Sequence, residues 1–238
     1  MRAWVQARWE TRLLLRNGEQ VLLTVLIPLA LLLGLTLLDI WPVRDDKVAT
    51  AVAAVWTVSV LATCFTSLAI ATGFERRSGA LRYLATTPLT RMELLFGKTL
   101  ATGFVTALSV ILVGLVALAL GWRPTWWVLP SLGLMCVAGC AFATWAFVLA
   151  GTLRAEAVLA VANAIFLGLL FLGGIVVPVD RLPPVLSNIA GLLPTGALSE
   201  GLTTMLVDGS HPGIWPVAIE LAWLVCGLAI ARRTFRWS

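Results

Sequence analysis

The sequence predicts an all-α, polytopic membrane protein with six transmembrane helices, and three observations support this fold class. The chain has 238 residues and a mean hydropathy of +0.96, and only 12% of its residues are charged, whereas a soluble domain carries about 25%. Its apolar residues gather in runs of about eighteen or more, the length of a membrane-crossing helix. These runs are continuous and do not alternate, which favours helices over a transmembrane barrel.

Six such runs divide the chain, which we expect to form a single transmembrane domain over residues 1–238. The predicted spans are about 21–40, 48–74, 99–121, 128–150, 158–177 and 214–231. Thirteen of the seventeen Lys and Arg residues lie in the N-terminal segment, in 75–98, at Arg154 and in the C-terminal tail. Because Lys and Arg accumulate in cytoplasmic loops, both termini and the 75–98 loop are expected in the cytoplasm.

The first twenty residues predict a helix lying on the membrane surface. Arg8, Arg12 and Arg16 recur every four residues and form one basic row. Trp4, Ala7 and the residues at helical spacing after them form another face. This pattern is typical of an interfacial helix. The alternative is an ordinary cytosolic segment whose charges only fix the topology.

The segment 75–98 predicts a short cytosolic helix between the second and third spans. Ser78 can cap a helix that Pro88 ends, because the residue before a proline disfavours helical geometry. Leu81, Leu84 and Ala85 would form its apolar face, with Tyr83 at the margin. Such a helix can transmit motion from a cytosolic partner, or it can be a connecting loop with topology-fixing charges.

Two neighbouring patterns concern the start of the third span. Thr90-Arg91-Met92-Glu93 has the form of a capping box, so the helix of this span is expected to begin there. The sequence "FGKT" at 96–99 ends like a phosphate-binding loop, but the first glycine of that motif would be Met92 and no strand precedes it. We therefore expect no ATP binding by this stretch.

Residues 178–213 predict a hairpin of two short helices on the outer side. Two apolar pieces of about ten residues, 184–193 and 196–207, are separated by Pro194-Thr195-Gly196. Each piece is too short to cross the membrane, and Thr195 could cap the second helix. We expect a re-entrant hairpin; a plain amphipathic outer loop is the alternative.

Few residues within the spans carry chemistry. Asn163 and Glu220 lie inside the fifth and sixth spans and are possible pathway residues, although Glu220 is shallow enough to reach the interface or pair with Arg181 or Arg123. Cys136 and Cys140 lie one turn apart, but no His or carboxylate is near them in sequence. Two ligands from one helix do not make a metal site, so we expect none and interpret both as small buried hydrophobic residues.

Three stretches, in order, resemble the permeases of ABC type-2 exporters. "ERRSGALRYLATTPLTRMELLFGK" is similar to the cytosolic loop of that family. The matching positions are Glu75, Gly79, Leu81, Leu84, Thr87, Pro88, Leu89 and Lys98. "RWETRLLLRNGEQVLLTVLIP" resembles the family's entry helix and first span through Arg16-Asn17 and Pro28, and "GGIVVPVDRLPPVLSNIAGLLPTGALSEGL" resembles its outer hairpin. The positions matched in the hairpin are Gly174, Pro178, Leu182, Pro183, Ile189, Pro194 and Glu200.

The resemblance implies the membrane half of an ATP-driven exporter, with no catalytic residue in this chain. Its coupling helix, at about 78–87 and including Tyr83, would sit in a groove of a cytosolic ATPase. Pro178, Pro183, Pro194 and Glu200 would belong to an outer gate. Two ATPase chains, which bind ATP and Mg²⁺, and a second permease, identical or paralogous, would complete the transporter.

The scarcity of charges in the spans favours a hydrophobic or amphipathic compound, such as a drug, an antibiotic or a lipid, as the exported substrate. Two other functions stay open: a non-transporting membrane anchor or regulator of an ATPase, and an intramembrane lipid-modifying enzyme. The enzyme needs clustered carboxylates, His or Cys near the interface, and Asp45-Asp46 is the only acidic pair. Fifteen Arg against two Lys is the ratio that codon bias in a GC-rich genome would produce, so we expect a bacterial cytoplasmic membrane.

Overall fold

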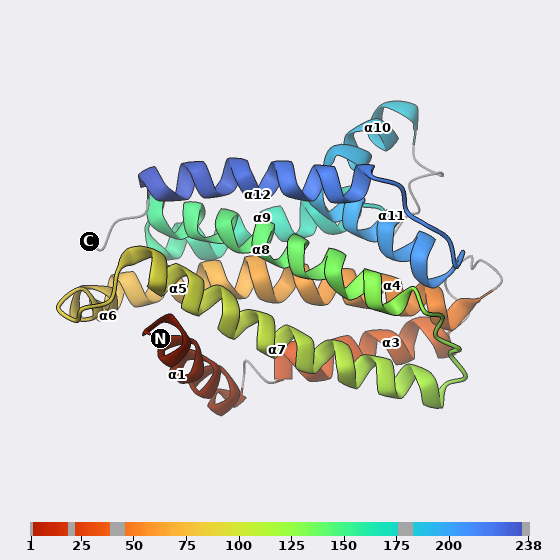
Figure 1. Ribbon diagram of the computed structural model, residues 1–238, viewed down its shortest axis with the longest axis horizontal. Coiled ribbons are helices and arrows are strands. Elements are labelled where there is room, and N and C mark those ends of the chain that lie inside the picture. The colour runs from red at the N-terminus through yellow and green to blue at the C-terminus, as the bar shows by residue number, and fades with distance from the viewer. Residues whose placement is uncertain (1, 19–21, 39–45, 176–182, 235–238) are drawn as a thin grey trace.

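The computed structural model describes residues 2–18, 22–38, 46–175 and 183–234. All regular structure within these ranges is helical, and the longest helices lie side by side along the long axis of the molecule (Figure 1). This confirms the all-α class. One of the prolines expected in the outer gate, Pro178, lies outside the described residues.

The helices follow one another as a simple up-and-down chain. They are α1 (Arg2–Arg16), η1 (Leu22–Leu26), α3 (Ile27–Leu37), α4 (Lys47–Val60), η2 (Leu61–Ser67), α5 (Leu68–Ser78), α6 (Ala80–Leu84), α7 (Arg91–Ala119), α8 (Val128–Thr152), α9 (Ala155–Leu172), α10 (Pro184–Leu192), α11 (Pro194–Leu206) and α12 (Trp215–Thr234).

Within the described residues, five helices are long and apolar enough to cross a membrane, one fewer than the six predicted. The first predicted span, 21–40, corresponds to η1 and α3 together, and its apolar helix extends only over Thr24–Leu37. The flanking residues 19–21 and 39–45 are outside the described ranges. The second span is longer than predicted, because α4, η2 and α5 form one helix over Lys47–Ser78.

This long second span is the centre of the fold. Its middle part, η2, has π-helical geometry, and α4 is almost entirely buried. The span contacts α3 and α7 as well as α8, α9 and α11. The helix α8 in turn packs along the whole of α12, while α9 and α12 leave most of their own surface exposed.

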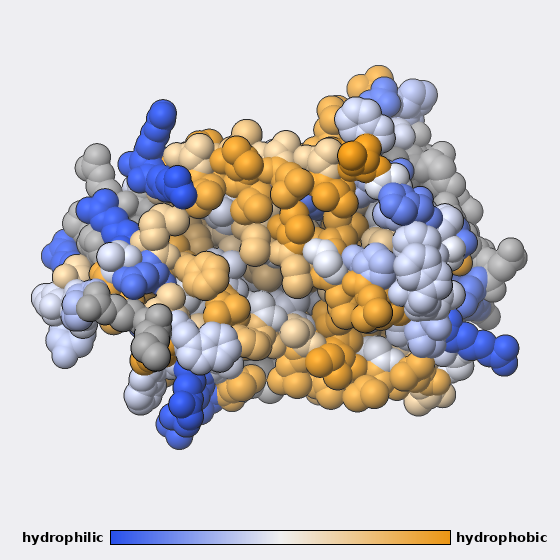
Figure 2. Space-filling model, in the orientation of Figure 1, coloured by the Kyte–Doolittle hydropathy of each residue, from blue (hydrophilic) through white to orange (hydrophobic). Residues whose placement is uncertain are grey.

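The molecule has two ends that carry hydrophilic residues, joined by an apolar middle (Figure 2). The helices α1 and α6 lie at one end together with the C-terminal end of α12, and α10 and α11 lie at the other (Figure 1). Apolar residues cover most of the visible surface between the ends, and hydrophilic residues gather at the α1 and α6 end (Figure 2). This distribution is the one expected of a protein that crosses a bilayer.

Two short helices, α10 and α11, lie where two were predicted in the segment 178–213, and the re-entry of this segment into the membrane stays a prediction. The predicted cap is wrong: α11 begins after Leu193, with Pro194 in its first turn, and Thr195 is already inside the helix. Proline suits a first helical turn because it has no N–H to leave unpaired. At Gly196 a Cβ would come within 1.8 Å of the Ala190 carbonyl oxygen, so this glycine allows α10 and α11 to meet.

Candidate functional site

The end of the molecule formed by α1 and α6 holds most of the predicted functional residues. The long second span continues to Ser78, and Gly79 then adopts a left-handed conformation with φ of 81°, which ends α5 and turns the chain into α6. Left-handed geometry is readily accessible only to glycine. The predicted capping role of Ser78 is therefore wrong, because its hydroxyl donates to the Glu75 carbonyl oxygen within α5.

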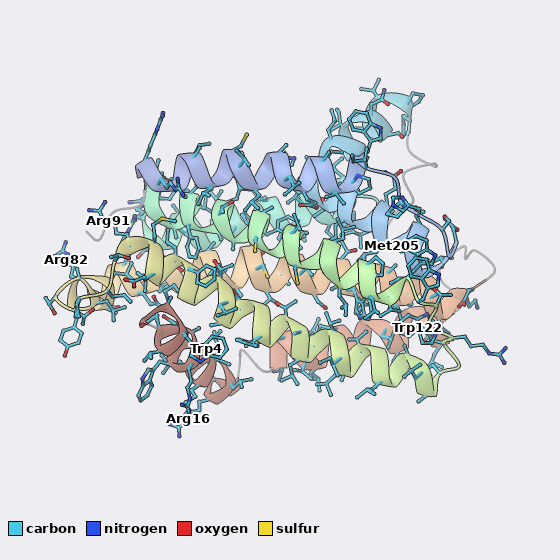
Figure 3. The ribbon with its side chains drawn as sticks, viewed as in Figure 1. Trp4, Arg16, Arg82, Arg91, Trp122 and Met205 are labelled. Carbon is cyan, nitrogen blue, oxygen red and sulfur yellow. The ribbon has the colours of Figure 1, made fainter. Side chains whose placement is uncertain are left out.

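Two residues of the predicted apolar face of α6, Leu81 and Leu84, pack on the chain's own core, whereas Ala85 is exposed. Leu81 has no exposed surface, and Leu84 and Leu89 pack partly buried against the core of the chain. Tyr83 is 76% exposed, and Arg82 also points away from the bundle (Figure 3). The apolar residues of α6 thus fix it to its own chain. The exposed surface of α6 and the residues after it consists of Ala80, Arg82, Tyr83, Ala85, Thr86, Thr87 and Pro88.

A buried ion-pair cluster holds three helices together beside α6. The Lys98 ammonium of α7 lies 2.7 Å from a carboxylate oxygen of Glu75 on α5 and 2.8 Å from one of Glu10 on α1. Gln6 donates a further hydrogen bond of 2.8 Å to Glu10. Only 3% of the Lys98 side chain is exposed. An ammonium so deeply buried requires such partners, because the loss of hydration is otherwise too costly.

Close packing at Gly97 accompanies this cluster. A Cβ at position 97 would lie 2.9 Å from Gln6 Cγ and 3.2 Å from the Ala3 carbonyl oxygen. A side chain at position 97 would therefore collide with Gln6 and with the backbone of α1, so this glycine allows α1 to pack closely on α7. The three arginines of the predicted row, Arg8, Arg12 and Arg16, are all exposed on α1, and the interfacial position of this helix stays a prediction.

Further contacts fix the C-terminal end of α5 and the start of α7. Arg76 donates to the Leu153 carbonyl oxygen, and Arg77 forms an ion pair with Glu156 at the start of α9. The predicted capping box is confirmed, since Thr90 accepts from the Glu93 N–H at 3.2 Å and the Glu93 carboxylate accepts from the Thr90 N–H at 2.8 Å. The loop that carries α6 is thus anchored on both sides.

At the opposite end, the predicted gate residues within the described ranges differ in their burial. Pro194 is buried at the start of α11, whereas Pro183 and Glu200 are exposed. The helix α11 is buried along most of its length against α4, α8 and α12. Trp223 of α12 donates to the Leu192 carbonyl oxygen at the junction of α10 and α11, at 3.0 Å.

A comparison with protein-family models decides the classification. The model described as "ABC-2 family transporter protein" matches residues 42–231, which is most of the chain. The chain belongs to the ABC-2 transporter family. A search of curated proteins finds no match. As an ABC-2 permease, the chain is a multi-pass membrane component of a transporter, and its family implies association with ABC ATPase subunits. The helix α1 lies before the matched residues.

Two residues predicted to line the pathway of the permease occupy different environments. Asn163 is exposed on α9, and its side chain donates to the Leu159 carbonyl oxygen of the same helix at 2.9 Å. Glu220 has no exposed surface, and neither of its carboxyl oxygens has a hydrogen-bond partner within the described residues. The expectation that Glu220 reaches the interface is therefore wrong. The alternative expectation, an ion pair between Glu220 and Arg181, involves a residue outside the described ranges.

Two further predictions about the permease can be compared with its structure. Residues 96–99 lie in the second and third turns of α7, and Lys98 is bound to carboxylates, so this stretch does not have the geometry of a phosphate-binding loop. Cys136 and Cys140 are exposed on α8, contrary to the expected burial. No group of three or more potential metal ligands occurs among the described residues.

Sequence reasoning missed Glu10, Gln6 and Gly97. A local signal for Glu10 was present, because Ala7 and Glu10 continue at helical spacing along the face of α1 that is buried. A carboxylate on a mostly apolar face indicates a buried cation elsewhere, but the sequence alone does not say which one. The structure identifies it as Lys98.

Proposed function

We propose that this ABC-2 permease forms the transmembrane pathway of an ATP-driven exporter for a hydrophobic or amphipathic compound. Two copies, or this chain and a paralogue, would form the pathway. Two separate ATPase chains would bind ATP and Mg²⁺ on the cytoplasmic side. In this arrangement the α1 and α6 end faces the cytoplasm, in agreement with the excess of Lys and Arg in the segments at that end.

The observation that carries the proposal is the exposed face of α6, a helix that is itself fixed to the bundle. Tyr83 and Arg82 project from a helix whose Leu81 is buried in the core. Aromatic and arginine side chains are the residues most enriched at the centres of protein interfaces. A partner that contacts this face would therefore push on the bundle and not on a freely moving loop.

The long second span connects α6 to the opposite end of the molecule and would transmit a displacement of α6. The helix Lys47–Ser78 has 32 residues, so it is roughly 48 Å long at 1.5 Å per residue. Its α5 end carries α6, and its α4 end contacts α11 at the other side of the molecule. A small displacement at α6 can thus be transmitted along one continuous helix as a rigid-body movement. We infer that this helix links ATPase closure to opening of the outer side.

The class of substrate follows from the chemistry of the spans. Among the described residues, the buried charged side chains are Glu10, Lys98 and Glu220. The first two already bind each other near the α6 end. A pathway with so few charges would coordinate a small ion poorly, whereas an apolar compound needs no such coordination.

The test is co-purification from native membranes together with a transport assay. We expect the tagged chain to recover a nucleotide-binding ATPase, and Tyr83→Ala to reduce both this recovery and ATP-dependent efflux. Trp126→Ala is the matched control, because Trp126 is also exposed, at 67%, but lies at the opposite end. Recovery of the ATPase without any flux would instead support a non-transporting anchor, and recovery of no ATPase at all would contradict the proposal.

A further inference from the structure

A groove separates α1 from α7 on one side of their crossing. It has a volume of about 400 Å³, and its lining consists of Trp4, Ala7, Arg8, Thr11, Arg12 and Phe104. Five of these residues belong to a single face of α1, since they recur at helical spacing. A cavity of this size lies within the range that proteins use for small ligands, about 300 to 1,000 Å³.

The groove arises from the way the two helices cross. They touch at Gly97, where the missing side chain allows close approach of α1. Phe104 lies seven residues further along α7, where its ring meets that of Trp4 edge to face with centroids 5.8 Å apart. Trp4 lies between α1 and α7 (Figure 3). This aromatic pair therefore joins the two helices and lines the groove.

The lining combines an apolar wall with two cations. Trp4, Ala7 and Phe104 provide the apolar wall, while Arg8 and Arg12 are exposed at the rim. Neither arginine forms an ion pair with a carboxylate of the described residues, because the nearby Glu10 is bound to Lys98 and Gln6. The Arg12 guanidinium lies 6.0 Å from the ring of Trp9, which leaves its donors available.

We propose that this groove binds one anionic phospholipid of the surrounding membrane. Its phosphate would accept hydrogen bonds from Arg8 and Arg12, and one acyl chain would lie against Trp4 and Phe104. A ligand that is apolar at one end and anionic at the other matches the lining, since guanidinium groups bind phosphate well. The other exposed residues of α1 support a lipid neighbour, because Val5, Trp9 and Leu13 are each more than half exposed.

Occupancy of the groove has a consequence for α6. Glu10 lies on the same helix as Arg8 and Arg12 and binds Lys98, which in turn binds Glu75 at the end of α5. A lipid held between α1 and α7 therefore stabilises the position of α1, and with it the cluster beside α6. Anionic lipid becomes a regulator of this permease, independently of the compound that it transports.

The experiment counts lipids bound to the purified chain by native mass spectrometry, with phosphatidylglycerol and phosphatidylcholine as probes. We expect the chain to bind one phosphatidylglycerol in preference to phosphatidylcholine. The double variant Arg8→Gln/Arg12→Gln should weaken this binding roughly 30-fold, since each arginine near a lipid headgroup raises the affinity about fivefold. Trp4→Ala should weaken it for both lipids, because it removes the apolar wall.

Two control variants on the same helix keep the test specific. Arg16→Gln removes an exposed arginine outside the groove, and Leu15→Ala removes an exposed apolar side chain outside it. Both should bind phosphatidylglycerol as the unmodified chain does. Equal binding of the two lipids by the unmodified chain, or unchanged binding by the double variant, would overturn the proposal. A change of the double variant from dimer to monomer at constant lipid content would also overturn it. Such a change would indicate that the groove binds a second copy of this chain and not a lipid.

Discussion

Lys98 Nζ lies 2.7 Å from a carboxylate oxygen of Glu75, although the two residues are 23 positions apart. They are the first and last positions of the loop pattern by which the chain resembles ABC type-2 exporter permeases. The ion pair therefore closes the loop that presents α6, and Glu10 extends it to α1. The loop is fixed at its base by electrostatics and at its middle by the burial of Leu81.

The first prediction concerns the cation of this cluster. Lys98→Met should lower the free energy of unfolding by about 3 to 5 kcal/mol, because it leaves two carboxylates close together without a compensating charge. The expected result is a lower midpoint of thermal unfolding in detergent and the loss of stimulated ATPase activity. Arg91→Met provides the control, since Arg91 is exposed at the start of the same helix. Equal midpoints for the two variants would show that the cluster contributes little.

Local patterns predicted the fold well, and long-range contacts account for the errors. The capping box of Thr90 and Glu93 was predictable because it lies within four residues and needs no partner elsewhere. Ser78 and Thr195 also suit helix caps, but neither acts as one. Gly79 can adopt the left-handed conformation that ends α5, and Pro194 occupies the first turn of α11.

The partners of the charged residues could not be predicted in the same way. Glu10 and Lys98 are 88 positions apart, and only the packing of α1 on α7 brings them together. The spacing of Leu81 and Leu84 fits a face buried in the chain's own core as well as an exposed apolar face. Periodicity shows which residues share a helix face, but not what that face packs against. The structure decides the question by burying Leu81 in the chain's own core.

The second prediction separates stability from partner binding within α6. Leu81→Ala should destabilise the protein by about 2 to 5 kcal/mol, because it removes a fully buried side chain. Tyr83→Ala should leave the unfolding midpoint unchanged, because Tyr83 is 76% exposed. Thermal unfolding followed by circular dichroism measures both. A large loss of stability in Tyr83→Ala would mean that this residue supports the fold and is not free to bind a partner.

The third prediction tests the packing of α12 on α8. A Cβ at Gly227 would lie 2.1 Å from Thr144 Oγ1 and 2.8 Å from Trp145 Nε1, whose N–H donates to the Trp223 carbonyl oxygen. Gly227→Ala should therefore destabilise the chain by about 1 to 3 kcal/mol through overpacking. Gly168→Ala on α9 is the matched control, since no atom lies within 4 Å of its added Cβ. This control should be neutral or slightly stabilising, because alanine has the higher helix propensity.

The fourth prediction concerns Glu220, whose carboxyl group is buried in α12 without a described partner. Burying a polar group without a hydrogen bond costs about 1 to 3 kcal/mol. Glu220→Leu should therefore keep or raise the midpoint of thermal unfolding, because it replaces an unsatisfied group by an apolar one of similar volume. Because Glu220 is a possible pathway residue, we expect the same variant to lose efflux activity. A Glu220→Leu variant that transports normally would show that this carboxyl group lies outside the pathway, whereas one that unfolds at a lower temperature would show that the group stabilises the fold.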